Sequence, residues 1–470
     1  MKINFVSLLF FLFFCINSNL CAHKFAKYNI VIDTDCGLDD FRAITYFCAS
    51  ADFNINAITT TDGVLEPQQG ANYLSELLKI YHHEGIKIGI GTKNNASKKY
   101  STHALPLWQK FFSNNENKEF SKSDDLLYNA IKNNQNKTII IALGPLTNIS
   151  QLIDNHRDII QYIDYILWYS NFNDIPQGYN YEQNKTAYEN ICNNRIMLKC
   201  LSAKDINFSK TFSADCETIN TKYSTTLNKF FDKKLSDFSL WDDLLPLYIL
   251  YPSLFKESFE ANKVVKITTK EDAIYEDLIL SILNTNKKDA GIVFNEVPSE
   301  GYFIQKDVKE FCGTIIDNYG YVEYKLCALT SEIHSHLGIY SIIGAKMGLR
   351  IMEYLHCGLD EIKIESLAGT MPPLSCLNDG IQVGTGATIG YGAISVRKTE
   401  ATYPQIIVNY NNRKINIKLK NNIYKEISEK IQEIVNIYGL NSDMYWVKLR
   451  EQSILYWRDL DRYMIFEINE

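Results

Sequence analysis

Four carboxylates crowd one short segment near the start of the chain. The segment reads NIVIDTDCGLDDFRAITYF and contains Asp33, Asp35, Asp39 and Asp40. Its apolar beginning predicts a buried strand, Gly37 permits a tight turn, and a helix is expected to begin near Phe41. Like charges this close must be neutralised by protons or by a cation. Because oxygen ligands favour hard ions, four Asp predict a Ca²⁺ or Mg²⁺ site, whereas a simple helix N-cap needs only one or two.

Two known patterns compete for this segment. An EF-hand needs an oxygen donor at the fifth loop position and a glutamate at the twelfth, where this chain has Gly37 and Ile44, so an EF-hand is excluded. A haloacid-dehalogenase-like phosphatase also begins with a strand and Asp-x-Asp, but its usual Gly-Thr does not follow here. A phosphatase is therefore a minor alternative, which release of phosphate would distinguish.

The sequence DTDCGLDD resembles the signature Asp-Thr-Asp-Pro-Gly-x-Asp-Asp of the inosine/uridine-preferring nucleoside hydrolase family, with Cys36 in place of proline. Three further motifs of that family have counterparts in the same order. They are ALGPLTN at 142–148, YEQN at 181–184 and WDDLLPLYILYP at 241–252. The resemblance covers about residues 27–315, and the order of the motifs makes it specific.

The resemblance implies a set of site residues. Those that would hold Ca²⁺ are the side chains of Asp35, Asp40 and Asp242 and the backbone carbonyl of Thr147. Asp35 would also take the proton from the attacking water. Those that would bind sugar hydroxyls are Asp39, Asn180, Glu182 and Asn184. These residue types suit hydrolysis of an N-glycosidic bond, because a metal acidifies water and carboxylates stabilise an oxocarbenium-like transition state.

The chain departs from the family pattern at two positions. The family usually has an asparagine on the ribose where this chain has Val64, and a histidine that protonates a purine where this chain has Trp241. Trp241 is interpreted either as a ring that stacks on a base or as a core or rim aromatic. The water-activating half of the site is therefore expected to be intact, with sugar and base recognition altered.

Strand-like runs alternate with helical patterns over the first 310 residues. The strand-like runs include Tyr28–Ile32, Ile55–Thr60, Thr138–Leu143 and Tyr162–Trp168. This alternation predicts an α/β fold with a mostly parallel open sheet. Ligands bind beyond the carboxyl ends of the strands of such sheets, where the acidic segment falls. The composition shifts near residue 315, and a boundary is expected at 317/318.

The region after residue 318 has its own candidate ligands. His334 and His336 would face the same way on extended chain and could reach one metal, whereas on a helix they would diverge. Solvated or capping histidines are the plainer alternative. Downstream, Cys376 precedes a glycine-rich run at 384–392. That run could cradle phosphate with backbone amides, although tight turns or a closely approached backbone explain it more simply.

Together these pieces resemble the FmdE family of formylmethanofuran dehydrogenase proteins, over about residues 322–396 with a weaker tail to 470. The resemblance implies a smaller, metal-binding α+β domain over 318–470. Its candidate ligands are His334, His336 and Cys376, for Zn²⁺ or another transition metal. A Cys-Pro that often follows the histidines in the family is Gly338-Ile339 here, so one possible ligand is missing.

The N-terminus reads as a signal peptide over residues 1–22. Lys2 is followed by an apolar run from Val6 to Cys15, and Ala22 could precede a cleavage point. The run is shorter than the ~20 apolar residues that a membrane span needs, and no later stretch reaches that length. We therefore expect an exported protein, periplasmic or secreted, with no membrane span. Its net charge of −7 argues against nucleic acid as a partner.

The leading hypothesis from the sequence is an exported, calcium-dependent N-glycosidase acting on a small nucleoside-like substrate. Its nucleoside hydrolase-like domain would span 23–317, and the C-terminal domain would carry the second metal. A binding protein for a ligand or a metal, on a catalytically altered fold, is the alternative. A homo-oligomer is compatible with either hypothesis. The complete set of metal-site positions argues against a protein that only binds.

Overall fold

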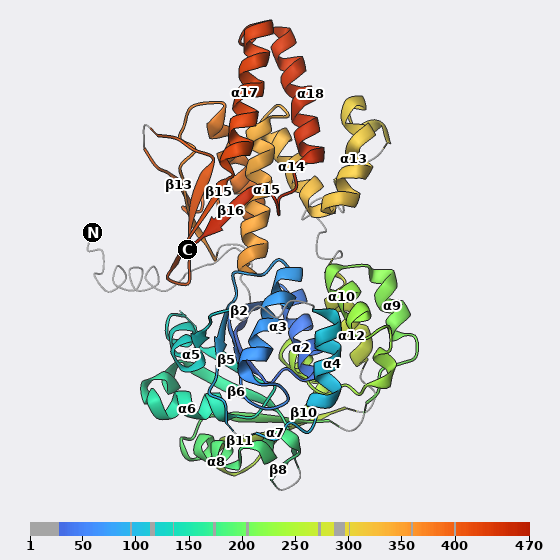
Figure 1. Cartoon of the computed structure of the whole chain (residues 1–470), viewed down its shortest axis with the longest axis vertical. Coiled ribbons are helices and arrows are strands. Elements are labelled where there is room, and N and C mark those ends of the chain that lie inside the picture. The colour runs from blue at the N-terminus through green and yellow to red at the C-terminus, as the bar shows by residue number, and fades with distance from the viewer. Residues whose placement is uncertain are drawn as a thin grey trace, which may run out of the picture.

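The computed structural model describes most of the chain in two stacked units (Figure 1). The described ranges are 28–94, 96–112, 118–134, 136–172, 175–203, 206–270, 274–285, 297–299, 301–358, 361–398 and 401–470. The signal peptide predicted at 1–22 lies outside them. None of the described helices is long and apolar enough to cross a membrane.

The first unit is built on a nine-stranded sheet in the order β10-β11-β9-β6-β5-β1-β2-β3-β4. The strands are β1 (Tyr28–Thr34), β2 (Phe53–Thr60), β3 (Lys87–Ile90), β4 (Ser121–Lys122), β5 (Thr138–Ala142), β6 (Ile163–Tyr169), β9 (Leu198–Ser202), β10 (Phe255–Phe259) and β11 (Val264–Thr269). All neighbouring strands run parallel except β10 and β11. The predicted α/β fold with a mostly parallel sheet is confirmed.

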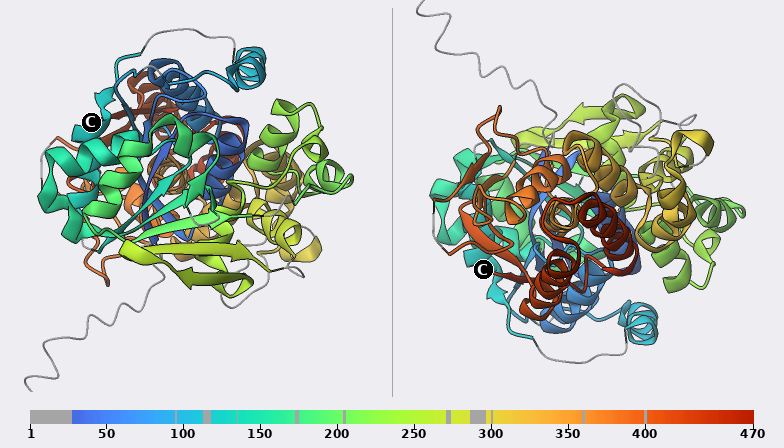
Figure 2. Two further views of the ribbon diagram at one scale, coloured as in Figure 1. Left: turned by 90° about the horizontal axis from the view of Figure 1, so that it is seen from below. Right: turned by 90° about the horizontal axis from the view of Figure 1, so that it is seen from above.

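Helices cover both faces of this sheet (Figure 2, left). They include α2 (Leu38–Ala49), α3 (Pro67–Ile80), α4 (Ser101–Phe111), α5 (Ser123–Lys132), α6 (Thr147–Asn155), α8 (Lys185–Asn193), α10 (Lys222–Phe230), α11 (Leu244–Leu250) and α12 (Tyr275–Leu283). Successive side chains of a strand point to opposite faces. In β1, Ile30 and Ile32 pack with α2, α3 and α10–α12, whereas Val31 packs with α5, α6 and α8. Because helices cover both faces of this central strand, consecutive residues such as Ile30, Val31 and Ile32 are all apolar.

The second unit is a smaller α+β domain. Its sheet has the order β13-β12-β14-β15-β16, with β12 (Lys363–Ser366), β13 (Ile394–Val396), β14 (Gln405–Tyr410), β15 (Arg413–Leu419) and β16 (Phe466–Asn469). Its helices are α13 (Lys306–Tyr319), α14 (Tyr321–Ile333), α15 (Ile339–Leu355), α16 (Leu377–Thr385), α17 (Asn421–Tyr438) and α18 (Asp443–Asp459). The boundary expected at 317/318 falls inside α13, whose side chains share a core with α14, α15 and α18.

Glycines bring α15 and α16 into close contact. A Cβ on Gly344 would lie 2.2 Å from the Leu377 carbonyl oxygen, and one on Gly380 would lie 2.1 Å from the Ser341 carbonyl oxygen. Gly384 opposes Gly348 in the same way, with 3.0 Å between a Cβ on Gly348 and the Gly384 Cα. The first of the glycines at 384–392 therefore serves a closely approached backbone, the simpler of the two explanations given above.

The second unit docks on the amino ends of the strands of the first (Figures 1 and 2). Gly85 N–H, just before β3, donates to the Tyr354 carbonyl at 2.8 Å. His356 Nε2 donates to the Cys48 carbonyl at 2.6 Å, and Tyr410 Oη contacts Asn54 at the start of β2. The carboxyl ends of the strands thus lie on the far side of the sheet from the second unit.

Candidate active site

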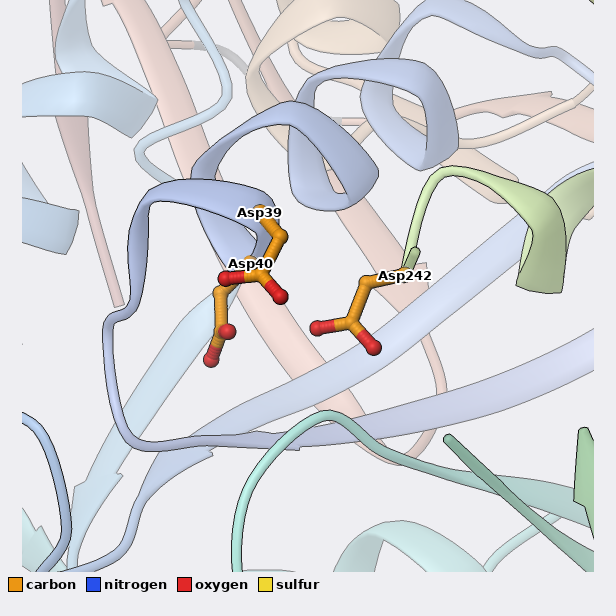
Figure 3. A group of neighbouring side chains, drawn as sticks. All are labelled: Asp39, Asp40 and Asp242. Carbon is orange, nitrogen blue, oxygen red and sulfur yellow. The ribbon is translucent and has the colours of Figure 1, made fainter. Parts of the chain in front are cut away.

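Three carboxylates converge at the carboxyl end of the sheet (Figure 3). Asp39 and Asp40 lie in the first turn of α2, and Asp242 lies just before α11. One oxygen from each lies within 4.8 Å of the other two. Residues that are about 200 positions apart in the sequence therefore form one cluster.

The cluster has the character of a cation site. Among the described residues, no hydrogen-bond donor faces either carboxylate oxygen of Asp242, although both are buried. Burial and the neighbouring Asp39 and Asp40 raise the pKa of Asp242 well above its usual range. Burial and Asp40 raise the pKa of Asp39 to about 7. A buried carboxylate without a partner is costly, and a hard cation removes that cost, so the residues present fit Ca²⁺ or Mg²⁺.

The turn between β1 and α2 aims these side chains. Thr34 Oγ1 donates to Asp40 Oδ2 at 2.5 Å, and Cys36 N–H donates back to Thr34 Oγ1 at 3.0 Å. Cys36 has a φ of 62°, a left-handed conformation that reverses the chain before the helix. Cys36, at the position where the family signature has proline, therefore has a strained backbone conformation.

Asp35 lies beside the cluster on the wall of a cavity of about 440 Å³. Its Oδ2 accepts a hydrogen bond from Val64 N–H at 2.9 Å. Burial, followed by the charge of Asp40, raises the pKa of Asp35 well above its usual range. Val64 thus contributes its backbone to the site. A buried carboxylate with a raised pKa is suited to accept a proton.

Aromatic side chains form the opposite part of this cavity. They are Tyr100, Tyr169, Tyr179, Phe238 and Trp241, with His103 beside them. The Trp241 side chain is 41% exposed, which is unusual for a large aromatic residue. Trp241 therefore lines the cavity and is not a core residue, and its ring is open to a ligand in the cavity.

Sequence reasoning missed two sets of buried hydrogen bonds beside the site. Arg42 Nε and Nη2 donate to the two oxygens of Asp243 at 2.8 Å each, and Arg42 also donates to the Ser239 carbonyl. Asp33 Oδ1 accepts hydrogen bonds from Thr59 and Asn148, at 2.6 and 2.8 Å. The signal in the sequence was an arginine, Arg42, in the otherwise apolar run that follows Asp40 in α2.

The predicted sugar-binding residues are not all brought together. Asp39 and Asn180 line the cavity, and Asn180 Nδ2 donates to the Leu143 carbonyl at 2.8 Å. Glu182, in α7 (Tyr179–Gln183), is exposed and pairs with Lys185 at 2.9 Å, away from the cavity wall. Asn184 caps α8 and donates to Thr147 Oγ1 at 3.0 Å. The structure therefore does not place Glu182 or Asn184 against the cavity, and Thr147 lies buried at the start of α6.

The predicted second metal site is only partly assembled. The rings of His334 and His336 lie 4.2 Å apart, because Ser335 between them has a φ of 62°. His334 Nδ1 bonds Asp379 at 2.7 Å, and its Nε2 is buried without a partner among the described residues. Cys376 precedes α16 and does not join the two histidines in a three-ligand cluster; within the described ranges, only the three aspartates form one. The pair lies in a turn after α14, neither on extended chain nor within a helix.

This fold and this carboxylate cluster are those of a hydrolase acting on N-glycosyl compounds. The chain belongs to the inosine-uridine preferring nucleoside hydrolase family, whose model matches residues 30–273. A second family model, FmdE of the molybdenum formylmethanofuran dehydrogenase operon, matches residues 333–442. Both predicted resemblances are confirmed.

Solved structures of nucleoside hydrolases are similar to part of the chain. One is a purine-preferring ribonucleoside hydrolase from Gardnerella vaginalis, at 16% identity and a TM-score of 0.46, which covers 55% of this chain and 98% of its own. Another is an inosine-uridine preferring nucleoside hydrolase from Bacillus anthracis, at 13% identity and a TM-score of 0.45, which covers 55% of this chain and 99% of its own. A search of curated proteins finds no match to the chain.

Proposed function

We propose that the protein is an exported, calcium-dependent N-glycosidase that hydrolyses a nucleoside or a nucleoside-like compound. The observation that carries the proposal is the position of Asp35. Its buried carboxylate lies beside the aspartate cluster, on the wall of a 440 Å³ cavity. A proton acceptor, a cation site and a ligand cavity therefore meet at one end of the sheet.

The residues that would hold Ca²⁺ are Asp35, Asp40, Asp242 and the carbonyl of Thr147. The unpartnered oxygens of Asp242 and the raised pKa of Asp39 support a cation at this place. Calcium, when bound, supplies a positive charge that acidifies water and holds sugar hydroxyls.

Asp35 is the proposed general base. Val64 N–H holds its Oδ2, so Oδ1 is the oxygen that receives a proton from water. The raised pKa of Asp35 favours the protonated product of that step. Asp39, on the same wall, adds negative charge that stabilises an oxocarbenium-like sugar as the glycosidic bond breaks.

The aromatic wall is the proposed place for the base. Tyr100 and Tyr179 meet edge to face with ring centroids 5.0 Å apart, and Trp241 lies on the same cavity. Planar bases stack on such rings. The family's proton-donating histidine is Trp241 in this chain, so recognition of the leaving base through stacking is favoured over its protonation from this position.

The test is release of free base and reducing sugar from a panel of nucleosides by the purified mature protein. We expect release that needs Ca²⁺, stops with a chelator and is lost in Asp35→Asn. The amide oxygen of Asn can still accept the hydrogen bond from Val64 N–H, but the side chain is not a base. Asp35→Asn therefore removes proton transfer and keeps this contact. Calcium bound tightly in the same preparation, without release from any nucleoside, would favour the ligand-binding alternative.

A transition metal at His334 and His336 is the second part of the proposal. The buried, unpartnered Nε2 of His334 supports it, since a metal would give that atom a partner. Cys376 is the third proposed ligand. Elemental analysis after dialysis should find about one Zn²⁺ or similar ion per chain, which His334→Ala and His336→Ala both remove. Retention of the metal by both variants would exclude this site.

A further inference from the structure

The segment that follows β2 holds the proposed general base in place. Val64 N–H donates to Asp35 Oδ2 at 2.9 Å, and Leu65 N–H donates to the Asp35 carbonyl at 3.0 Å. At Gly63 there is no room for a side chain, because a Cβ would lie 2.1 Å from Asp35 Oδ2. The position of the Asp35 carboxylate therefore depends on where this segment lies.

Asp62 lies in the same segment, but its side chain contacts Asn94 and Lys98 and not Asp35. Its side chain is 1% exposed, and it accepts a hydrogen bond from Asn94 N–H at 2.9 Å and pairs with Lys98 Nζ. Lys98 Nζ also donates to the Leu65 carbonyl at 3.3 Å. Asn94 and Lys98 belong to the segment between β3 and α4, which we call the β3–α4 segment. The Asp62 side of this pair is buried and the Lys98 side chain is 31% exposed, so separating the two segments would leave a buried carboxylate without its charge partner.

The far side of the β3–α4 segment meets α7. Tyr179 Oη donates to the Ser97 carbonyl, and Ser97 N–H donates to Gln183 Oε1 at 2.6 Å. Both of these hydrogen bonds are exposed to solvent. The segment ends in Tyr100, whose ring packs against Tyr179 at the cavity wall. The segment thus lies between a buried anchor at Asp62 and exposed contacts at α7.

We infer that Asp62 is a positioning residue for the reaction. Through Lys98 and Asn94 it fixes the segment that ends in Tyr100, and through its own backbone neighbours it fixes Asp35. One residue therefore sets the distance between the proposed base and the aromatic wall that receives the leaving group.

This inference rests on the proposed function only for its kinetic part, and its structural part is tested without substrate. Lys93, Lys98 and Lys99 make the β3–α4 segment a substrate for trypsin. In Asp62→Asn we expect cleavage after Lys98 or Lys99 to be about tenfold faster than in the wild type, with mass spectrometry locating the cut. Lys93→Met is the matched control, because Lys93 pairs with Glu66 on the surface of the same region. That variant should be cleaved after Lys98 or Lys99 at the wild-type rate.

The kinetic part uses the nucleoside that the wild type hydrolyses best. Asp62→Asn and Lys98→Met should each raise KM about tenfold, and the double variant should resemble either single one, because both remove the same pair. A wild-type KM, or an unchanged rate of tryptic cleavage in folded Asp62→Asn, would overturn the inference. Absence of turnover in the wild type would instead remove the proposed function and leave the tryptic test to decide on Asp62.

Discussion

Arg42 and Asp243 form an ion pair that is sealed from solvent immediately beside the aspartate cluster. Two nitrogens of the guanidinium donate to the two carboxylate oxygens at 2.8 Å each, and the side chains are 1% and 0% exposed. The Asp243 carboxylate also accepts from Trp241 N–H at 3.1 Å. Since α2 carries Arg42, this pair ties the turn with Asp242 to the helix that presents Asp39 and Asp40.

Removing one partner of this pair should damage both stability and cation binding. Arg42→Met leaves the Asp243 carboxylate buried without a counter-charge, which is expected to lower the free energy of unfolding by about 3–5 kcal/mol. Urea unfolding measures that loss, and calcium titration calorimetry measures weaker binding. Lys110→Met is the control, because its pair with Asp232 is exposed and should change stability by less than about 1 kcal/mol. Equal stability of the two variants would contradict the role given to the pair.

Asp242→Asn should separate stability from cation binding. Without a cation, the three carboxylates repel one another, so replacing one with a neutral amide should leave the calcium-free protein equally stable or about 1 kcal/mol more stable. Calcium at a hundred times its Kd stabilises a protein by ~2.7 kcal/mol, and this gain should vanish in the variant. Melting temperatures with and without calcium test both parts. An undiminished calcium response in Asp242→Asn would exclude the cluster as the cation site.

The contact between the two units should weaken in acid. His83 Nδ1 donates to the Glu353 carbonyl at 2.5 Å, and its Nε2 accepts from Tyr223 Oη at 2.8 Å. Burial, followed by the nearby His356, holds the pKa of His83 well below its usual range, and burial lowers the pKa of His82 to about 4. The unfolded chain therefore binds protons that the folded chain does not. The contribution of these two histidines to stability should be complete above pH ~6.5 and fall as the pH drops below that value.

Urea midpoints between pH 5 and pH 8 measure this effect. A single buried histidine changes the free energy of unfolding by at most ~1.4 kcal/mol per pH unit, and a histidine that is partly exposed to solvent contributes less. His83→Gln should remove this contribution, so the difference in midpoint between the variant and the wild type should change between pH 5 and pH 8. A difference in midpoint between the wild type and His83→Gln that is the same at pH 8 and pH 5 would contradict the burial of a neutral His83 at this contact.

Glu182→Gln tests a difference between the sequence motif and the structure. The family motif implies a sugar contact for Glu182, but in the structure its side chain is exposed and bonded to Lys185. We expect kcat/KM of the variant to stay within about twofold of the wild type, since an exposed pair contributes little. The matched comparison is Asp39→Asn, on the cavity wall, which should lose at least about a hundredfold. A similar loss in Glu182→Gln would mean that α7 rearranges when substrate binds.

Much of the fold could be predicted because its signals are local. The apolar runs of β1, β2, β5 and β6 and the helical patterns between them specify a parallel sheet through their periods alone. The turn at Cys36 and Gly37 follows from residues adjacent in the chain, and so does the presence of Asp39 and Asp40 in the first turn of α2. The sequence therefore determined one half of the carboxylate cluster and the end of the sheet on which it lies.

The other half was decided by packing between distant segments. The family motif at 241–252 assigned Asp242 to the metal site, but the buried pair of Arg42 and Asp243 that ties its turn to α2 appears only in the folded structure. Glu182 and Asn184 sit in a matching motif, yet the course of α7 turns one outward and uses the other as a cap. The placement of the second unit on the amino edge of the sheet likewise depends on which surfaces complement each other. Local patterns fix what each segment can form, and only the assembled core fixes which side chains meet.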